Sequence, residues 1–210
     1  MVAMVDAPRR EEEVFVPLPA PRHQLPPTTQ FRSTWIVSSQ NALRERGHYD
    51  RYVELLPSEL RETITMTIVG AWVPIEHAVA HYTACDRLEL SAADRVELGR
   101  AVTKHLDQTL LSTAARLATS AGATVWTPLG QIRRLWERMF VGGGMAVYKL
   151  GPKETRIEVH GCALAPIAYF RTGLQGVLQG IGERFCQKLY VSEIPRLTTP
   201  TSIAYRGSWV

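Results

Sequence analysis

Hydrophobic residues recur every three to four positions through the middle of this chain. The spacing predicts a long helix over residues 91–121, which opens with a serine cap, and another over residues 127–140. Shorter helices are expected before them, bounded by glycine or proline, at residues 38–46, 48–56 and 74–86. The segment Phe31–Val37 is rich in β-forming side chains and predicts a first strand.

After Gly142–Gly144 the hydrophobic repeat changes to two, which is typical of strands with one solvated face. The alternating segments are Met145–Leu150, Lys153–Gly161, Gln187–Ile194 and Ser202–Trp209. Between the two pairs, Pro166–Cys186 returns to helical spacing with one apolar stripe. The sequence therefore predicts an α+β fold, with N-terminal helices packed on a small antiparallel sheet built from two C-terminal hairpins flanking a helix.

Residues 1–30 differ in composition from the rest of the chain. They contain six prolines, which remove backbone donors and disfavour regular pairing. We expect residues 1–30 to form a disordered proline-rich tail and residues 31–210 to form a single domain. The apolar triplet Val14–Val16 within the tail is a candidate docking segment for a protein partner.

Composition narrows the class of protein. A chain of 210 residues with 45% hydrophobic residues suits one globular domain with a core. The net charge of +4 is typical of a solvated surface, so no nucleic-acid partner is expected. Three widely spaced cysteines without a CxxC pair predict reduced thiols and a cytoplasmic location. Because no apolar run approaches the ~20 residues of a membrane span, neither a span nor a signal peptide is expected.

Glycines mark one side of the helix predicted at residues 166–186. Gly173, Gly176 and Gly180 fall together on a helical wheel, away from the apolar stripe. They lie inside a helix, whereas a dinucleotide-binding fingerprint needs glycines between a strand and a helix start. Each costs about 1 kcal/mol relative to alanine, which indicates a compensating close contact. The contact is either packing on the domain's own elements or a homodimer face.

Two small groups of residues suggest chemistry. His77 and His81 share one face of a predicted helix and could hold a metal ion; hydrogen-bonded, half-buried histidines are the alternative. His160 and Cys162 could form a base and a nucleophile, but no third orienting residue is recognisable. No catalytic residue is predicted, and the sequence favours a protein that is not an enzyme.

Aromatic side chains are the candidates for a ligand pocket. The set consists of Trp72, Tyr82, Trp136, Phe140 and Phe170, together with His160. They could line a cavity for a small apolar molecule, and ordinary core packing explains most of them equally well.

Several segments together resemble a myxobacterial paralogous family of unknown function, over residues 31–210. They are Trp72–Glu76 before a helix, the long helix from Ser91, the segment Gly173–Gly180 and the closing strand that ends in Trp209. The order helix, hairpin, helix, hairpin also resembles the 4-vinyl-reductase, haem-NO-binding and TRAPP-like ligand-binding superfamily. This resemblance implies a domain that binds small apolar molecules or forms dimers.

The chain departs from two branches of that superfamily. The haem-NO branch uses a Tyr-x-Ser-x-Arg motif, and here Ile194 follows Tyr190-Val191-Ser192-Glu193 where the arginine belongs. The vinyl-reductase branch often carries cysteines near its C-terminus, and here only Cys186 lies there. No cofactor is therefore expected. The leading hypothesis is a non-catalytic sensor or adaptor domain that binds a small hydrophobic ligand as a homodimer. The alternatives are a protein–protein interaction module without ligand and a metal- or haem-dependent protein.

Overall fold

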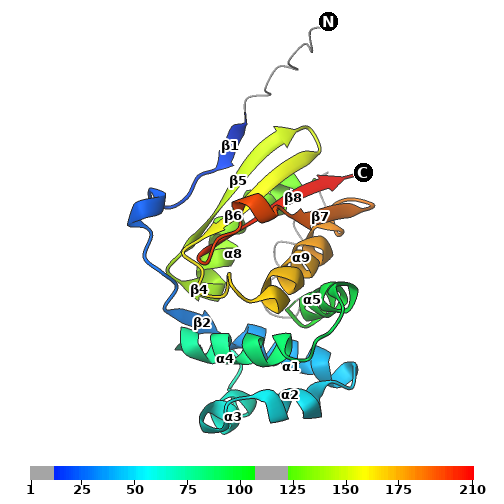
Figure 1. Ribbon diagram of the computed structural model, residues 1–210. Helices are drawn as coiled ribbons and strands as arrows, with labels where there is room; N and C mark the ends of the chain where they lie inside the picture. Colours follow the sequence, from blue (N-terminus) through cyan, green and yellow to red (C-terminus); the bar gives the residue numbers. More distant parts are fainter. Residues whose placement is uncertain (1–11, 107–122) are drawn as a thin grey trace, which may run out of the picture.

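Five antiparallel strands form the larger sheet, in the order β1-β5-β6-β8-β7 (Figure 1). The strands are β1 (Glu13–Val16), β5 (Gly144–Gly151), β6 (Glu154–His160), β7 (Leu189–Glu193) and β8 (Ser202–Trp209). The computed structural model describes residues 12–106 and 123–210, and the side chains of 104–106 lie outside this description. A second sheet has the order β3-β2-β4, from β2 (Gln30–Arg32), β3 (Trp72–Pro74) and β4 (Phe140–Val141).

The alternation of β6 divides the larger sheet into two faces. Ile157 is buried and lies between Val147 of β5 and Tyr205 of β8, which are also buried. The neighbouring residues Glu158 and His160 belong to the opposite face, because successive side chains in a strand point to opposite sides. The two C-terminal hairpins predicted from the sequence are confirmed, as is the α+β class.

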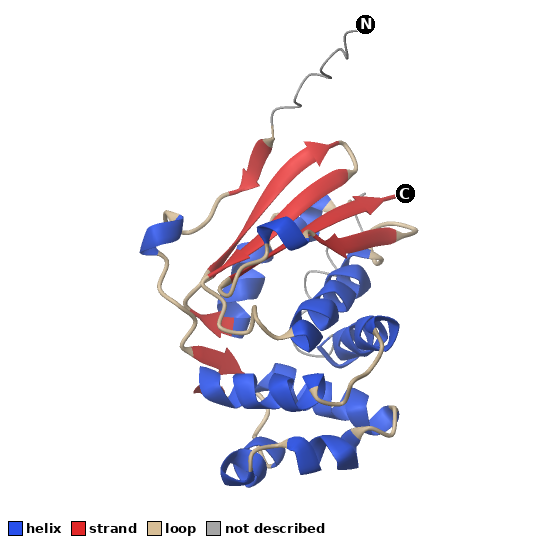
Figure 2. Ribbon diagram, viewed as in Figure 1, coloured by secondary structure: helices blue, strands red, loops and turns tan. Residues whose placement is uncertain are grey.

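Helices cover one face of the larger sheet and one of its ends (Figure 2). The covered face carries Ile157, which lines a cavity together with the helix residues Ile132 and Leu178. The described helices are α1 (Ser33–Glu45), α2 (Tyr49–Leu55), α3 (Ser58–Thr65), α4 (Ile75–Asp86), α5 (Ala92–Leu106), α7 (Trp126–Leu129), α8 (Ile132–Met139) and α9 (Ala168–Gly182). α8 packs against β5, α9 packs against β7, and α5 packs on α9. The layer of α1–α4 lies beyond one end of the sheet (Figure 1). The N-terminal helices therefore meet the larger sheet chiefly through α5, α8 and α9.

Two local predictions need correction. The segment predicted as a strand at Phe31–Val37 forms strand only as far as Arg32, and α1 begins at Ser33. The β-rich residues Thr34–Val37 are helical because packing of α1 against the rest of the molecule overrides their weak strand preference. The helix predicted at residues 127–140 is two helices, α7 and α8, separated at Gly130-Gln131. Residues 107–121 of the long predicted helix lie outside the described part.

Residues 12–30 are not a disordered tail. β1 pairs with β5 at Glu13↔Lys149 and Val14↔Tyr148, which makes it an edge strand of the larger sheet. Further along, Arg22 donates to Glu158 at 2.6 Å. The prolines permit this arrangement because they follow β1, and an edge strand needs hydrogen bonds on one side only. In the described part, no helix is long and apolar enough to cross a membrane.

Candidate functional site

The glycines of α9 make a close contact with α5 of the same chain. A Cβ atom built on Gly176 would lie 2.0 Å from the carbonyl oxygen of Val96. On α5, a Cβ atom on Gly99 would lie 2.0 Å from the carbonyl oxygen of Gly173. Gly180 faces the side chain of Thr103. The close contact predicted from these glycines is therefore present, and its partner is α5 of the same chain rather than a second molecule.

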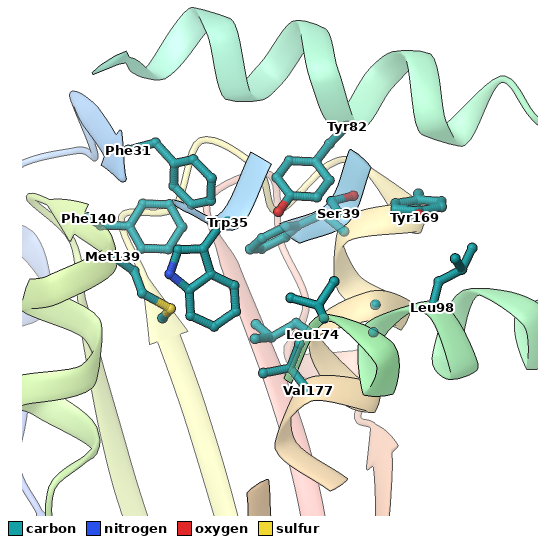
Figure 3. A pocket seen from close by; sticks show the side chains of 14 residues that line it. Phe31, Trp35, Ser39, Tyr82, Leu98, Met139, Phe140, Tyr169, Leu174 and Val177 are labelled. Atoms are coloured by element: carbon teal, nitrogen blue, oxygen red, sulfur yellow. The ribbon is translucent and has the colours of Figure 1, made fainter. Parts of the chain in front are cut away.

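The apolar stripe of α9, next to its glycine side, lines three adjoining cavities, which we call the α9 hollows. The first, of about 30 Å³, lies among α1, α4, α5 and α9 and includes Phe31, Tyr82, Phe140 and Phe170 in its lining (Figure 3). The middle hollow, of about 40 Å³, lies between α8 and α9 and shares Trp35, Met139, Leu174 and Val177 with the first. The far hollow, also of about 40 Å³, shares Ile132, Leu135, Leu178 and Ile181 with the middle one. The shared residues place the hollows side by side along α9.

Trp35 carries a buried donor beside the first two hollows. Its side chain is 8% exposed, and its Nε1 atom has no hydrogen-bond partner among the described residues. In Figure 3 the indole nitrogen points toward the side chain of Met139. An unpaired buried donor costs about 1–3 kcal/mol, so the site lacks an acceptor that a bound molecule could supply. The Tyr82 hydroxyl also points into the first hollow (Figure 3).

The structure brings together only part of the predicted ligand pocket. Tyr82, Phe140 and Phe170 line the first hollow. Trp136 stacks on Phe140 with ring centroids 4.1 Å apart, and both also line a separate groove of about 260 Å³ beneath residues 19–26. The Arg32 guanidinium stacks over Trp72, with its central carbon 3.8 Å from the centroid of the indole ring. Trp72 does not line an α9 hollow. His160 belongs to the opposite face of the sheet, where its Nε2 atom lies 2.9 Å from Glu158.

The sequence interpretation missed Trp35 and Leu174 as pocket residues. Trp35 fell in the segment predicted as a strand, so its helical position was not considered. On a helix, Trp35 and Ser39 lie four residues apart on one side, and both line the first hollow. Leu174 was assigned to the apolar stripe of α9, which the structure uses both for core packing and for the hollows.

The candidate metal residue His81 belongs to a buried polar chain. Its Nδ1 atom lies 2.6 Å from the Tyr52 hydroxyl, and its Nε2 atom lies 3.8 Å from Sγ of Cys85. Burial lowers the pKa of His81 to about 3, so the imidazole is neutral near pH 7. His77 is half-buried on the same helix. No group of three metal-ligating side chains occurs within residues 12–106 and 123–210, and both ring nitrogens of His81 already face groups of the chain itself.

Glu158 organises the other face of the sheet. This carboxylate is 4% exposed and contacts Arg22 at 2.6 Å, Arg156 at 2.8 Å and His160 at 2.9 Å. Burial alone would raise the pKa of Glu158, but the hydrogen bond to His160 and the charges of Arg22 and Arg156 outweigh burial and hold the pKa below its ordinary value. Through the ion pairs Arg22–Glu158 and Glu12–Arg156, the cluster holds the N-terminal segment against β6, which is a structural role.

Cys162 has the properties of an inert core thiol. It is fully buried, and burial raises its pKa to about 12. Since the thiolate is the nucleophile, a thiol of this kind is unreactive near neutral pH. His160 is engaged with Glu158. The structure thus offers no support for a His160–Cys162 catalytic pair.

We predict that only one of the three cysteines of the native protein reacts rapidly with a disulfide reagent at pH 8. Burial raises the pKa of all three thiols, but Cys85 and Cys162 are buried, whereas Cys186 is partly exposed and can be reached by the reagent. The reaction is followed by absorbance, with urea-unfolded protein as the control in which all three thiols react. Rapid reaction of two or more thiols in the native state would contradict the burial of Cys85 and Cys162.

Comparisons with solved structures show which proteins have a similar fold. No family model and no curated protein matches this chain. An Fe(II) unliganded H-NOX protein from K. algicida has a TM-score of 0.60 at 8% identity, over 85% of this chain and 96% of that one. A mutant of T. tengcongensis H-NOX has a TM-score of 0.58 at 11% identity, over 85% of this chain and 97% of that one.

An oxygen-binding H-NOX domain related to soluble guanylate cyclases gives a TM-score of 0.57 at 11% identity, over 85% of this chain and 94% of that domain. The comparisons give no support to the myxobacterial family. They support the haem-NO-binding resemblance at the level of the fold, which this chain shares with H-NOX domains.

Proposed function

We propose that this chain is a non-catalytic sensor or adaptor domain that binds a small apolar molecule in the α9 hollows. The observation that carries the proposal is the row of three adjoining apolar cavities along one helix, with the unpaired indole N–H of Trp35 beside two of them. The fold shared with H-NOX domains supports a small-ligand role by analogy.

Binding in the hollows requires a change of shape. Each hollow has a volume of about 30–40 Å³, whereas ligand pockets for drug-sized molecules have roughly 300 Å³ or more. A ligand must therefore widen the space between α8 and α9. α8 is short and follows the break at Gly130-Gln131, and its other end leads directly into β4. A movement of α8 would couple occupancy of the hollows to the surface of the domain, which is the physical basis of sensing.

Haem is the prosthetic group that the fold implies, since haem distortion is described for H-NOX proteins with this fold. The residues that line the α9 hollows do not fit it. No histidine or cysteine is in the described lining of the three hollows. Tyr82 and Tyr169 line the first hollow, but burial raises the pKa of both hydroxyls and disfavours the phenolate that would ligate iron. The proposed ligand is therefore a small apolar molecule other than haem.

An interaction module without ligand is the second candidate. It is favoured by the loop after α3, where Met66, Ile68 and Val69 are 75%, 79% and 57% exposed. Adjacent exposed apolar side chains are typical of contact surfaces. The predicted docking segment Val14–Val16 lies within β1, and the ring of Phe15 packs edge-on against Trp126 with ring centroids 5.0 Å apart. A homodimer and a protein partner remain proposals under either function.

Thermal unfolding with ten-carbon molecules tests the proposed function. At one hundred times the dissociation constant a ligand stabilises by about 2.7 kcal/mol, so saturating 1-decanol or decanoate should raise the melting temperature by about 5–10 °C. Val177→Phe fills the first and middle hollows and should abolish the shift, while Val141→Phe at a 41% exposed position should retain it. If neither molecule shifts the wild-type protein, the ligand-binding function is wrong.

A further inference from the structure

We propose that the ligand is an amphiphile with a single carboxylate head, which Arg138 and the indole N–H of Trp35 hold at the middle hollow. This inference rests on the proposed function and adds the chemical class of the ligand. It comes from the two donors at the middle hollow and from the apolar lining around them.

Arg138 is the one charged residue in the described lining of the three hollows. Its neighbours on α8 already have partners, since Arg133 pairs with Glu137 at 2.9 Å and Arg134 donates to Gln131 at 3.1 Å. The Arg138 side chain forms no ion pair with a residue of the described part, and only its backbone oxygen accepts a bond, from Arg32. A guanidinium at the edge of an apolar cavity can bind a carboxylate through two parallel N–H bonds, or bind one carboxylate oxygen while a second donor binds the other.

Trp35 supplies a second donor to the same hollow. Its Nε1 atom is buried and unpaired, and its side chain lines both the first and the middle hollows. A carboxylate has two oxygens and accepts bonds only, so one head group could satisfy both the indole N–H and the guanidinium. An alcohol offers a single oxygen and no charge, and an amine would meet repulsion from Arg138.

The rest of the middle hollow restricts the ligand further. Apart from Arg138 and Trp35, its described lining is entirely aliphatic or thioether side chains, such as Leu135, Met145 and Leu178. A larger polar head, such as a sugar or a phosphodiester, would leave its other oxygens without donors. From Leu174 to Gly182 the hollows follow about 12 Å of α9, because a helix rises 1.5 Å per residue. This length suits a medium-length hydrocarbon chain.

Calorimetric titration at pH 7.5 tests the head group, with decanoate, 1-decanol and decylamine as probes below their micellar concentrations. We expect wild-type protein to bind decanoate at least ten-fold more tightly than 1-decanol, and decylamine most weakly. Arg138→Met keeps the aliphatic stem and should remove the preference for decanoate while leaving 1-decanol binding unchanged. Trp35→Phe should weaken decanoate binding several-fold. Arg134→Met, on the same helix, should behave as wild type.

The outcomes separate this inference from the proposed function. Equal binding of decanoate and 1-decanol to wild-type protein would overturn the carboxylate head and leave an apolar ligand in place. A loss in Arg134→Met equal to that in Arg138→Met would also overturn it, since general surface charge would then explain the preference. Absence of binding by all three probes would refute both proposals.

Discussion

Gly176→Ala is expected to unfold at a much lower urea concentration than the wild-type protein. The added methyl group would lie 2.0 Å from the carbonyl oxygen of Val96, and backbone atoms cannot move aside as a flexible side chain can. α5 and α9 would have to separate, which costs about 3 kcal/mol at the upper end of the range for overpacking. The higher helix propensity of alanine returns only about 1 kcal/mol. Equilibrium urea unfolding at pH 7.5, followed by circular dichroism, measures the change.

Gly173→Ala is the matched control on the same helix. A Cβ atom on Gly173 would meet no atom within 4 Å, so this variant should be as stable as wild type or up to about 1 kcal/mol more stable. Similar midpoints for Gly176→Ala and wild type would contradict the close α5–α9 contact.

Light scattering on the wild-type protein tests the proposed homodimer. Because α5 covers the glycine side of α9, a homodimer would have to use another surface.

The free energy of unfolding should fall as the pH is lowered from 6.5 toward 3, by about 1.4 kcal/mol per pH unit from His81 alone. The folded state keeps His81 neutral, because burial lowers its pKa to about 3, while the unfolded state has a pKa near 6.5. The unfolded chain therefore binds one more proton within this window and gains stability as protons are added. This contribution is fully present above pH 6.5 and is lost as the pH falls toward 3.

His81→Gln provides the comparison for the pH experiment. Glutamine does not titrate and still offers a hydrogen-bonding group toward the Tyr52 hydroxyl, which lies 2.6 Å from Nδ1 in the wild-type protein. The variant is expected to be less stable at pH 7.5 but to lose the slope between pH 6.5 and 5, where few carboxylates titrate. Urea unfolding at half-unit pH intervals gives both slopes. An unchanged slope in His81→Gln would show that His81 is not the source.

The C-terminal half of the fold could be predicted because its signals are local. Alternation at Ile157 and Val159 indicated which side of β6 is buried, and Gly151-Pro152 marked the turn of the hairpin. The close contact at Gly176 could also be predicted, since a glycine inside a helix is costly unless another backbone approaches it. Its partner α5 could not be predicted, because the helical wheel shows a free face and does not show what covers it.

The N-terminal part depended on contacts that are distant in the sequence. Trp35 lies in a β-rich stretch, yet it is helical because its side chain is buried in the hydrophobic core. Residues 12–30 looked disordered from their prolines, but β1 pairs with β5 and Arg22 pairs with Glu158, more than one hundred residues further along the chain. For the same reason the sequence could not show that Trp72, Trp136 and His160 lie away from the α9 hollows, which Phe170 lines.

The central claim is that a small apolar molecule binds in the α9 hollows beside Trp35, and NMR of the indole N–H groups tests it most directly. The chain has five tryptophans, so ¹⁵N-labelled protein should give five indole signals, and Trp35→Phe identifies the signal of Trp35. On titration with decanoate, the Trp35 indole signal should shift strongly as its N–H gains an acceptor, while that of Trp72 should stay in place. An unmoved Trp35 signal at saturating decanoate would contradict the account.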